Sequence, residues 1–200
     1  LSGENNMFYN LLRAIGKVLF FFLGIKHEGL HNVPEEGAQI IASNHLSYYD
    51  PIVIAILIKR PIHYMAKEEF FQNKIFGKFL SAINAFPVKR GTADLGAVKN
   101  AIRILKRGEI LGVFPEGTRK NEGTDVTAQA GTALIAMKTG ACVIPVACIG
   151  TQHKIPFRTV KVVFGEPIKY DNENGRKINS KNLEVLSKQI ADEINLLRCK

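Results

Sequence analysis

Short apolar segments alternate with longer helical patterns along most of the chain, and this alternation limits the fold more than any other feature of the sequence. Segments rich in β-branched and aromatic residues predict strands at 38–43, 62–66, 84–88, 110–115, 142–150 and 160–167. Helical patterns fall at 51–60, 68–86, 93–108, 128–140 and 178–197. The alternation predicts an α/β fold with a mixed, largely parallel central sheet flanked by helices. Such sheets bind ligands at the carboxyl ends of their strands.

Local signals mark several helix ends. Asp50 is expected to be the N-cap of the first of these helices, with Pro51 at its first helical position. Thr92 is expected to cap the third helix, and Gly108 to end it. The apolar stripe of that third helix is predicted to consist of Leu95, Val98, Ile102 and Leu105.

Charge is concentrated in one part of the chain. The 200 residues, 46% of them hydrophobic, suit a single domain with a net charge of +9. Lys59 to Arg107 contain eleven Lys/Arg and three acidic residues, a net +8. Such an excess either serves solubility or attracts an anionic partner. The aromatic residues nearby are mostly Phe at helical spacing, which favours a lipid surface over nucleic acid as that partner.

The sequence "FYNLLRAIGKVLFFFLGI" (8–25) is mostly apolar but contains Arg13 and Lys17, four residues apart and therefore on one helix face. This pattern predicts an amphipathic helix over 7–26 that lies in a membrane interface, with both cations toward the headgroups. Packing on the chain's own domain is the alternative. The Phe-rich helix of 68–86 has a similar pattern. Residues 1–6, ahead of Met7, are expected to be a remnant of the expression vector.

The cysteines and the absence of several motifs exclude some classes of protein. Cys142, Cys148 and Cys199 form no disulfide framework, which is typical of a reducing cytosol. No spacing of Cys and His suggests a zinc site. The sequence also lacks the glycine-rich loops of nucleotide-binding proteins and the G-x-S-x-G motif of serine hydrolases.

Polar residues follow two of the predicted strands. In "SNHLSYYDP", His45 and Asp50 are either a catalytic base with its orienting carboxylate or two ordinary loop residues. In "FPEGTR", Glu116 and Arg119 follow the strand of 110–115, and Gly117 allows a tight turn or the close approach of a ligand. Taken alone, each stretch is also compatible with a polar loop.

The order of four motifs resolves this choice: "NHLSYYD" (44–50), "FPVKRG" (86–91), "FPEGTR" (114–119) and "VIPV" (143–146). With them, the chain from about residue 27 to 170 resembles the glycerolipid acyltransferase family, and within it the bacterial 1-acylglycerol-3-phosphate acyltransferases. The resemblance implies an acyltransferase domain over 27–200. In relatives, basic residues often precede the glycine of the helix after the third motif, whereas this chain reads "AQAG" (128–131).

The resemblance also implies roles for individual residues. His45 matches the catalytic histidine and Asp50 its partner, while Arg90 matches a basic residue that meets the substrate phosphate. Pro145 matches a proline associated with the acyl chain. The acceptor site would be shaped by Glu116, Gly117, Thr118 and Arg119.

The implied reaction transfers an acyl group from acyl-CoA or acyl carrier protein to the sn-2 hydroxyl of lysophosphatidic acid, giving phosphatidic acid. A histidine base suits this reaction near neutral pH, and no metal or other cofactor is expected. The expected location is the cytoplasmic face of the cell membrane, with peripheral or monotopic attachment to an anionic lipid surface and no nucleic-acid partner. A different acceptor, such as glycerol-3-phosphate or another lysolipid, or a non-catalytic membrane-binding relative, is the alternative.

Overall fold

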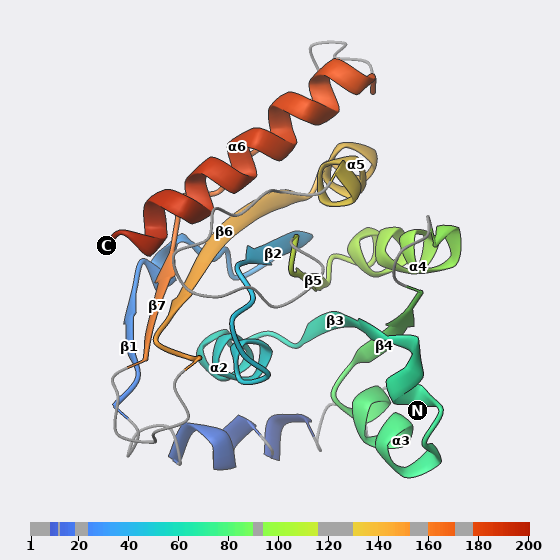
Figure 1. The fold of residues 1–200 in the computed structure, drawn as a ribbon, viewed down its shortest axis with the longest axis vertical. Helices are drawn as coiled ribbons and strands as arrows, with labels where there is room; N and C mark the ends of the chain where they lie inside the picture. Colours follow the sequence, from blue (N-terminus) through green and yellow to red (C-terminus); the bar gives the residue numbers. More distant parts are fainter. Residues whose placement is uncertain are drawn as a thin grey trace.

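The computed structural model describes residues 9–11, 13–18, 24–89, 94–115, 130–152, 160–170 and 178–200. The strands within these residues form one seven-stranded sheet in the order β1-β7-β6-β2-β5-β3-β4 (Figure 1). The run from β6 to β4 is parallel throughout, β7 is antiparallel to β6, and β1 is parallel to β7. The predicted mixed, largely parallel sheet flanked by helices is therefore confirmed.

The elements follow the predicted alternation closely. The strands are β1 (Lys26–Glu28), β2 (Gln39–Ser43), β3 (Ile62–Lys67), β4 (Ala85–Val88), β5 (Ile110–Val113), β6 (Cys142–Ile149) and β7 (Lys161–Phe164). The helices are η1 (Leu30–Asn32), α2 (Asp50–Leu57), η2 (Glu68–Phe71), α3 (Lys74–Ala82), α4 (Leu95–Lys106), α5 (Ala130–Thr139) and α6 (Ser180–Arg198). Strand β1 was not predicted, because its three residues are all exposed and carry no apolar signal.

The two faces of the sheet pack against different helices. On β2, Ile40 and Ala42 point into the core shared with α4, α5 and α6, whereas Ile41 points into the core shared with α2. This strict alternation follows from the two-residue period of a strand. Figure 1 shows α4, α5 and α6 along one face and α2 against the other. All of β2 is buried, so the residues that follow it emerge from the centre of the molecule.

Residues 9–11 and 13–18, here called the N-terminal helical turns, lie on the outer side of α2 (Figure 1). Arg13 donates from Nε to the carbonyl oxygen of Ile56 at 3.3 Å and from a terminal nitrogen to that of Lys59 at 3.1 Å. The prediction that Arg13 faces lipid headgroups is wrong. The physical reason is that carbonyls in the last turn of α2 and just beyond its end lack partners within the helix, and Arg13 supplies donors to two of them.

Two predicted helix caps are also wrong. Tyr49 is the N-cap of α2 and Asp50 is already helical, so its carboxylate points back into the preceding loop. Helix α4 is capped by Asp94, whose Oδ1 accepts from the Ala97 amide at 3.0 Å; Thr92 lies outside the described residues. The buried face of α4 differs from the predicted stripe and consists of Ala97, Ala101, Ile104 and Leu105. Small alanines allow close packing on the core, while Leu95 remains 68% exposed.

The single helix predicted over 68–86 is divided. The short η2 ends at Phe71, and α3 starts anew after Asn73, whose Oδ1 accepts from the Ile75 and Phe76 amides, each at 3.0 Å. An asparagine in this position is a strong N-cap, and periodicity alone does not reveal the break. The chain then enters β4 at the edge of the sheet, where Pro87 is tolerated because no further strand pairs there among the described residues.

Candidate functional site

His45 lies just beyond the carboxyl end of β2, near the centre of the sheet. Strand β2 pairs with β5 on one side and β6 on the other, and its last paired residue is Ser43. The His45 side chain is 11% exposed, so its ring is mostly enclosed but can still be reached from solvent. This is the position where parallel α/β sheets place their ligands.

Asp50 faces the ring of His45 from the first turn of α2. The Asp50 Oδ2 lies 2.9 Å from His45 Nδ1, and it also accepts from the Leu46 and Ser47 amides, each at 2.7 Å. The carboxylate is fully buried. A loop of only four residues separates the pair, and the carboxylate holds that loop by its own backbone donors. The predicted His45–Asp50 pair is therefore present in the structure.

This geometry determines which nitrogen of His45 is basic. An ionised carboxylate can only accept hydrogen bonds, so His45 Nδ1 carries a proton and donates it to Asp50. The other nitrogen, Nε2, then has a free lone pair and can take a proton from a bound alcohol. The buried negative charge stabilises the imidazolium that forms.

Two aromatic rings stack in series with the ring of His45 and support its side chain. Phe114, directly after β5, lies on the His45 ring at 4.1 Å between centroids, with 22° between the planes. Tyr64 of β3 stacks beneath Phe114 at 6.0 Å and 12°. Gly112 makes room for Tyr64, because a Cβ there would lie 2.2 Å from a carbon of the tyrosine ring. None of these contacts was predicted, since residues on different strands leave no local signal of their proximity.

Two buried groups near the pair are held in their neutral forms. Burial, and then the charges of nearby groups including Asp50, raises the pKa of the Tyr64 phenol well above its ordinary value. Burial, and then the Asp50 charge, raises the pKa of the Cys148 thiol in the same way. A thiol reacts as its thiolate, so Cys148 is poorly suited to be a nucleophile. His45, whose Nδ1 is held by Asp50, therefore remains the candidate for the catalytic base among the described residues at this end of the sheet.

The other predicted site residues are only partly covered by the structure. Strand β4 leads to Lys89 and strand β5 to Pro115, which are the last described residues before the second and third motifs continue. Arg90, Glu116, Gly117, Thr118 and Arg119 lie outside the described residues. Pro145 lies within β6, paired with Ala42 of β2, and is buried. The structure does not bring Pro145 into contact with His45 through any described interaction.

The described residues offer neither a metal centre nor a helix that spans a membrane. Across the described ranges, no three or more His, Cys, Asp and Glu side chains are grouped so that they could ligate a metal ion. In the same ranges, no helix has both the length and the hydropathy required to cross a bilayer.

Comparisons with known proteins agree with this geometry. A family model described as Acyltransferase matches residues 24–149. The 1-acyl-sn-glycerol-3-phosphate acyltransferase of Bacillus subtilis (strain 168) is 38% identical over 159 residues, covering 78% of this chain and 79% of that protein. The protein of the same name from Streptococcus pneumoniae is 29% identical over 205 residues, covering 98% and 75%. The crystal structure of the 1-acyl-sn-glycerophosphate (LPA) acyltransferase PlsC from Thermotoga maritima matches with a TM-score of 0.73 at 25% identity, covering 96% of this chain and 80% of that one.

Proposed function

The chain belongs to the acyltransferase family, and from this premise we propose that it transfers a fatty acyl group from a thioester to the sn-2 hydroxyl of 1-acylglycerol-3-phosphate, giving phosphatidic acid. The observation that carries the proposal is the buried hydrogen bond of 2.9 Å between His45 Nδ1 and Asp50 Oδ2. The choice of acceptor is supported by the names of the two relatives that cover most of the chain.

The proposed reaction proceeds by direct attack of the acceptor. His45 Nε2 removes the proton from the hydroxyl as its oxygen attacks the thioester carbonyl, and Asp50 stabilises the resulting imidazolium. The tetrahedral intermediate then expels the thiolate, which recovers the proton from His45. No nucleophilic side chain, metal or redox cofactor takes part. The raised pKa of Cys148 supports this route over an acyl-cysteine intermediate.

The phosphate of the acceptor is assigned to arginines. Arg90 and Arg119 match the basic positions of the second and third motifs, and a guanidinium binds phosphate through paired hydrogen bonds. The third motif also supplies Glu116, Gly117 and Thr118 to the acceptor site. If the arginines act as a clamp, Arg90→Ala and Arg119→Ala raise the KM for lysophosphatidic acid more than the KM for the donor.

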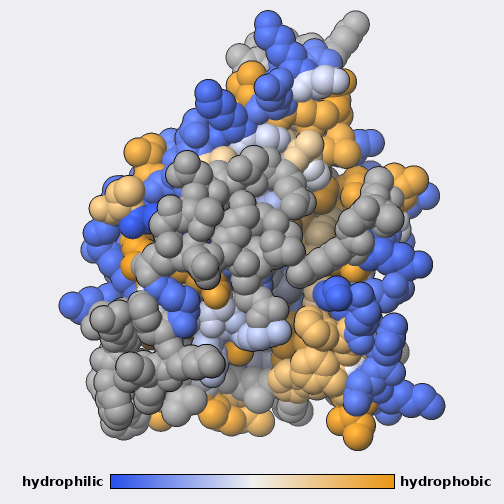
Figure 2. Space-filling view, viewed as in Figure 1, coloured by the Kyte–Doolittle hydropathy of each residue, from blue (hydrophilic) through white to orange (hydrophobic). Residues whose placement is uncertain are grey.

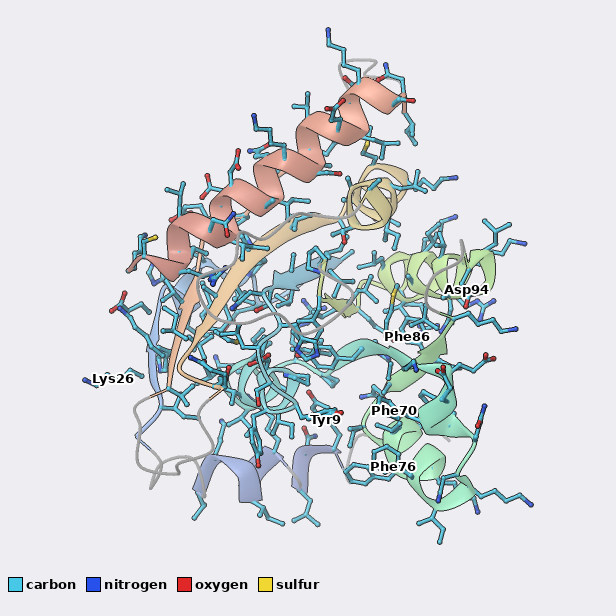
Figure 3. The ribbon with its side chains drawn as sticks, viewed as in Figure 1. Tyr9, Lys26, Phe70, Phe76, Phe86 and Asp94 are labelled. Atoms are coloured by element: carbon cyan, nitrogen blue, oxygen red, sulfur yellow. The ribbon has the colours of Figure 1, made fainter. Side chains whose placement is uncertain are left out.

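Contact with an anionic lipid surface is supported by apolar side chains on two helical segments. Leu11, Ile15 and Val18 of the N-terminal helical turns are exposed at helical spacing. On α3, Ile75 is 83% exposed, and its neighbours include Phe76 and Phe79. Figure 2 shows apolar atoms gathered over α3, with hydrophilic side chains along the adjacent edge. Phe70 of η2 and Phe76 of α3 lie near each other in Figure 3, and their rings meet edge to face.

Charge complements these apolar side chains. Lys74 and Lys78 flank Ile75 on α3, a helix that contains no acidic residue. A groove on this helix, with a volume of about 500 Å³, is lined by both lysines and by Ile75. Lysines beside exposed apolar groups are the composition of an interfacial helix, because the cations attract anionic headgroups while the apolar groups enter the acyl region. The proposed attachment is therefore peripheral, on the cytoplasmic leaflet.

A panel of substrates tests the proposed function. The purified protein is incubated with lysophosphatidic acid, glycerol-3-phosphate, other lysolipids or neutral monoacylglycerol, each with acyl-CoA or acyl carrier protein as donor, and the products are identified by mass spectrometry. We expect phosphatidic acid from lysophosphatidic acid, and poor turnover of the neutral acceptor. Equal rates with and without the phosphate would contradict the arginine clamp. A different preferred acceptor would replace the proposed substrate.

A further inference from the structure

The side chain of Asn44, the residue before His45, makes three hydrogen bonds that no part of the proposed mechanism uses: one from the Ser43 hydroxyl to Oδ1 at 3.4 Å, and two with the backbone of Cys148. Its Nδ2 donates to the carbonyl oxygen of Cys148 at 2.9 Å, and its Oδ1 accepts from the Cys148 amide at 2.7 Å. The Asn44 side chain is fully buried. One amide side chain thus satisfies both polar groups of one backbone residue on β6.

The two bonds to Cys148 replace the next pair of main-chain hydrogen bonds between β2 and β6. The parallel pairing of β2 with β6 ends at Ser43 opposite Val146, and Cys148 lies two residues further along β6. If β2 continued, its main chain would supply a donor and an acceptor to Cys148. Asn44 supplies both from its side chain instead, since an amide offers the same donor and acceptor as a peptide group. The β2 main chain is thereby free to leave the sheet.

We propose that Asn44 is a positioning residue for the base: it ends the β2–β6 ladder at a defined residue, so that the next one, His45, turns out of the sheet with Nδ1 on Asp50 and Nε2 toward the acceptor. The Cα of His45 is held between the Asn44 amide on one side and the Asp50 loop on the other. The predicted effect on the rate rests on the proposed acyl transfer. The predicted effect on the position of His45 is independent of it.

Loss of the Asn44 amide has a defined consequence. The N–H and C=O of Cys148 would be left buried without partners, and the chain at His45 would lose its attachment to β6. A displacement of the base by about 1 Å can lower a rate on the order of 10²-fold. A residue that acts in this way affects the chemical step and not the binding of substrates.

Gln39 provides a matched control on the same strand. It is also fully buried, and its Nε2 donates to the carbonyl oxygens of Pro34 and Glu36 at the opposite end of β2. We expect Asn44→Ala and Gln39→Ala to lower the melting temperature by similar amounts. Only Asn44→Ala should lower kcat, on the order of 10- to 100-fold, with each KM within about twofold. An equal effect of both variants on kcat would overturn the proposal.

A double mutant separates positioning from general destabilisation. If Asn44 acts through His45, adding Asn44→Ala to His45→Ala leaves the residual rate unchanged. A further drop as large as that in the wild-type background would overturn the proposal. If Asn44→Ala does not fold, Asn44→Ser, which keeps one small polar group, is measured in the same two backgrounds and judged by the same two outcomes.

Proton NMR tests the placement of His45 without substrates. The hydrogen-bonded Nδ1 proton of His45, assigned by its loss in His45→Ala, should give a protected downfield signal in the wild type and in Gln39→Ala. We expect it to broaden or disappear in the Asn44 variant that folds. An unchanged signal there would overturn the positioning role even if no acyl acceptor is turned over. Loss of the signal together with absent turnover in the wild type would contradict only the proposed function.

Discussion

At the scale of single residues, the site depends on how one carboxylate oxygen is shared. Asp50 Oδ2 accepts from His45 and from two backbone amides, whereas Oδ1 has no hydrogen-bond partner among the described residues. The same oxygen therefore orients the imidazole and shapes the loop that carries it. Stability and catalysis depend on Asp50 in different ways, because one requires an acceptor and the other a negative charge.

Replacement of His45 by alanine should remove the base while leaving the fold intact. We expect the rate of acyl transfer to fall about 10²- to 10⁴-fold, the usual effect of losing a general base. His31, on η1 and exposed, is the matched control, and His31→Ala should stay within about twofold of wild type. Initial rates and thermal melts monitored by circular dichroism test both variants. Activity of His45→Ala within threefold of wild type would end the assignment of His45 as the base.

Asp50→Asn should separate the two roles of the carboxylate. The amide oxygen can replace Oδ2 as acceptor, and the amide nitrogen would replace Oδ1, which has no partner to lose among the described residues. The melting temperature should thus change little, while the rate falls roughly tenfold or more because the imidazolium is no longer opposed by a charge. Rate measurements on the folded variant decide the question. A loss of stability with an unchanged rate would make Asp50 a purely structural residue.

At the scale of elements, strand β5 connects the sheet to the site through a residue that lacks a side chain. Gly112 faces the ring of Tyr64, which stacks on Phe114, which in turn stacks on His45. Any side chain at 112 displaces the first ring of this series. Strand β5 thus supports the His45 ring through this series of contacts. It also leads the chain into the third motif.

Gly112→Ala should destabilise the protein by about 1–3 kcal/mol and lower its activity, because a Cβ would lie 2.2 Å from a Tyr64 ring carbon. Gly131, in α5, is the matched control, because a Cβ added there would meet no described atom within 4 Å. Gly131→Ala should raise stability by about 0.5–1 kcal/mol through helix propensity. Urea unfolding curves measure both. Equal stability of Gly112→Ala and wild type would show that the ring stack adapts at little cost.

The caps of α3 and α4 should respond differently to acid. Backbone hydrogen bonds from Lys89 and Ala97 lower the pKa of Asp94, so its ionised form is favoured in the folded state. The free energy of unfolding should be lower for Asp94→Ala than for wild type at neutral pH. This difference in the free energy of unfolding should shrink once the pH falls below about 3.9, the pKa of an unfolded aspartate. It should disappear as the pH falls through the lowered pKa of Asp94 in the folded state. Asn73 caps α3 without titrating, so the gap for Asn73→Ala should stay constant over the same range, as urea titrations at each pH would measure.

At the scale of the whole molecule, exposed apolar side chains gather on the side where α2 covers the sheet. The N-terminal helical turns and α3 lie toward the same end of the molecule in Figure 1, and α6 lies along the opposite face. Because Tyr9 is buried and Arg13 bonds to carbonyls in the last turn of α2 and just beyond it, deleting the N-terminal helical turns would also disturb α2. Point substitutions on exposed residues are therefore the better test of membrane contact.

Ile15→Ser with Val18→Ser, and separately Phe76→Ser with Phe79→Ser, should weaken binding to anionic vesicles about tenfold or more, because each large apolar side chain contributes roughly 1.5–3 kcal/mol when buried in lipid. Val185→Ser on α6 is the control, since Val185 is 60% exposed on the opposite face. Co-sedimentation at low and high salt measures the apolar and electrostatic parts separately. Equal binding by all three variants would show that neither segment contacts the membrane.

The sequence alone determined the class of fold and the identity of the central pair. Patterns of period two and period 3.6 reflect which residues are buried, so most strands and helices from β2 to α6 were predictable, but the break between η2 and α3 was not. His45 and Asp50 were predictable because they lie close together in the sequence after a buried strand, His45 in the loop and Asp50 at the start of the next helix, and because a set of four ordered motifs supplied the family. The N-caps were the weakest predictions, since several polar residues near a helix start can serve.

Only the tertiary structure decided which distant residues meet at the base. Asn44 reaches Cys148, more than a hundred positions away, and Phe114 reaches His45 from the end of β5. Strand order sets these contacts, and strand order depends on how the helices pack against both faces, which no local pattern encodes. Arg13 illustrates the same limit: its spacing from Lys17 predicts a shared face, but unpaired carbonyls at the end of α2 decide where its guanidinium binds.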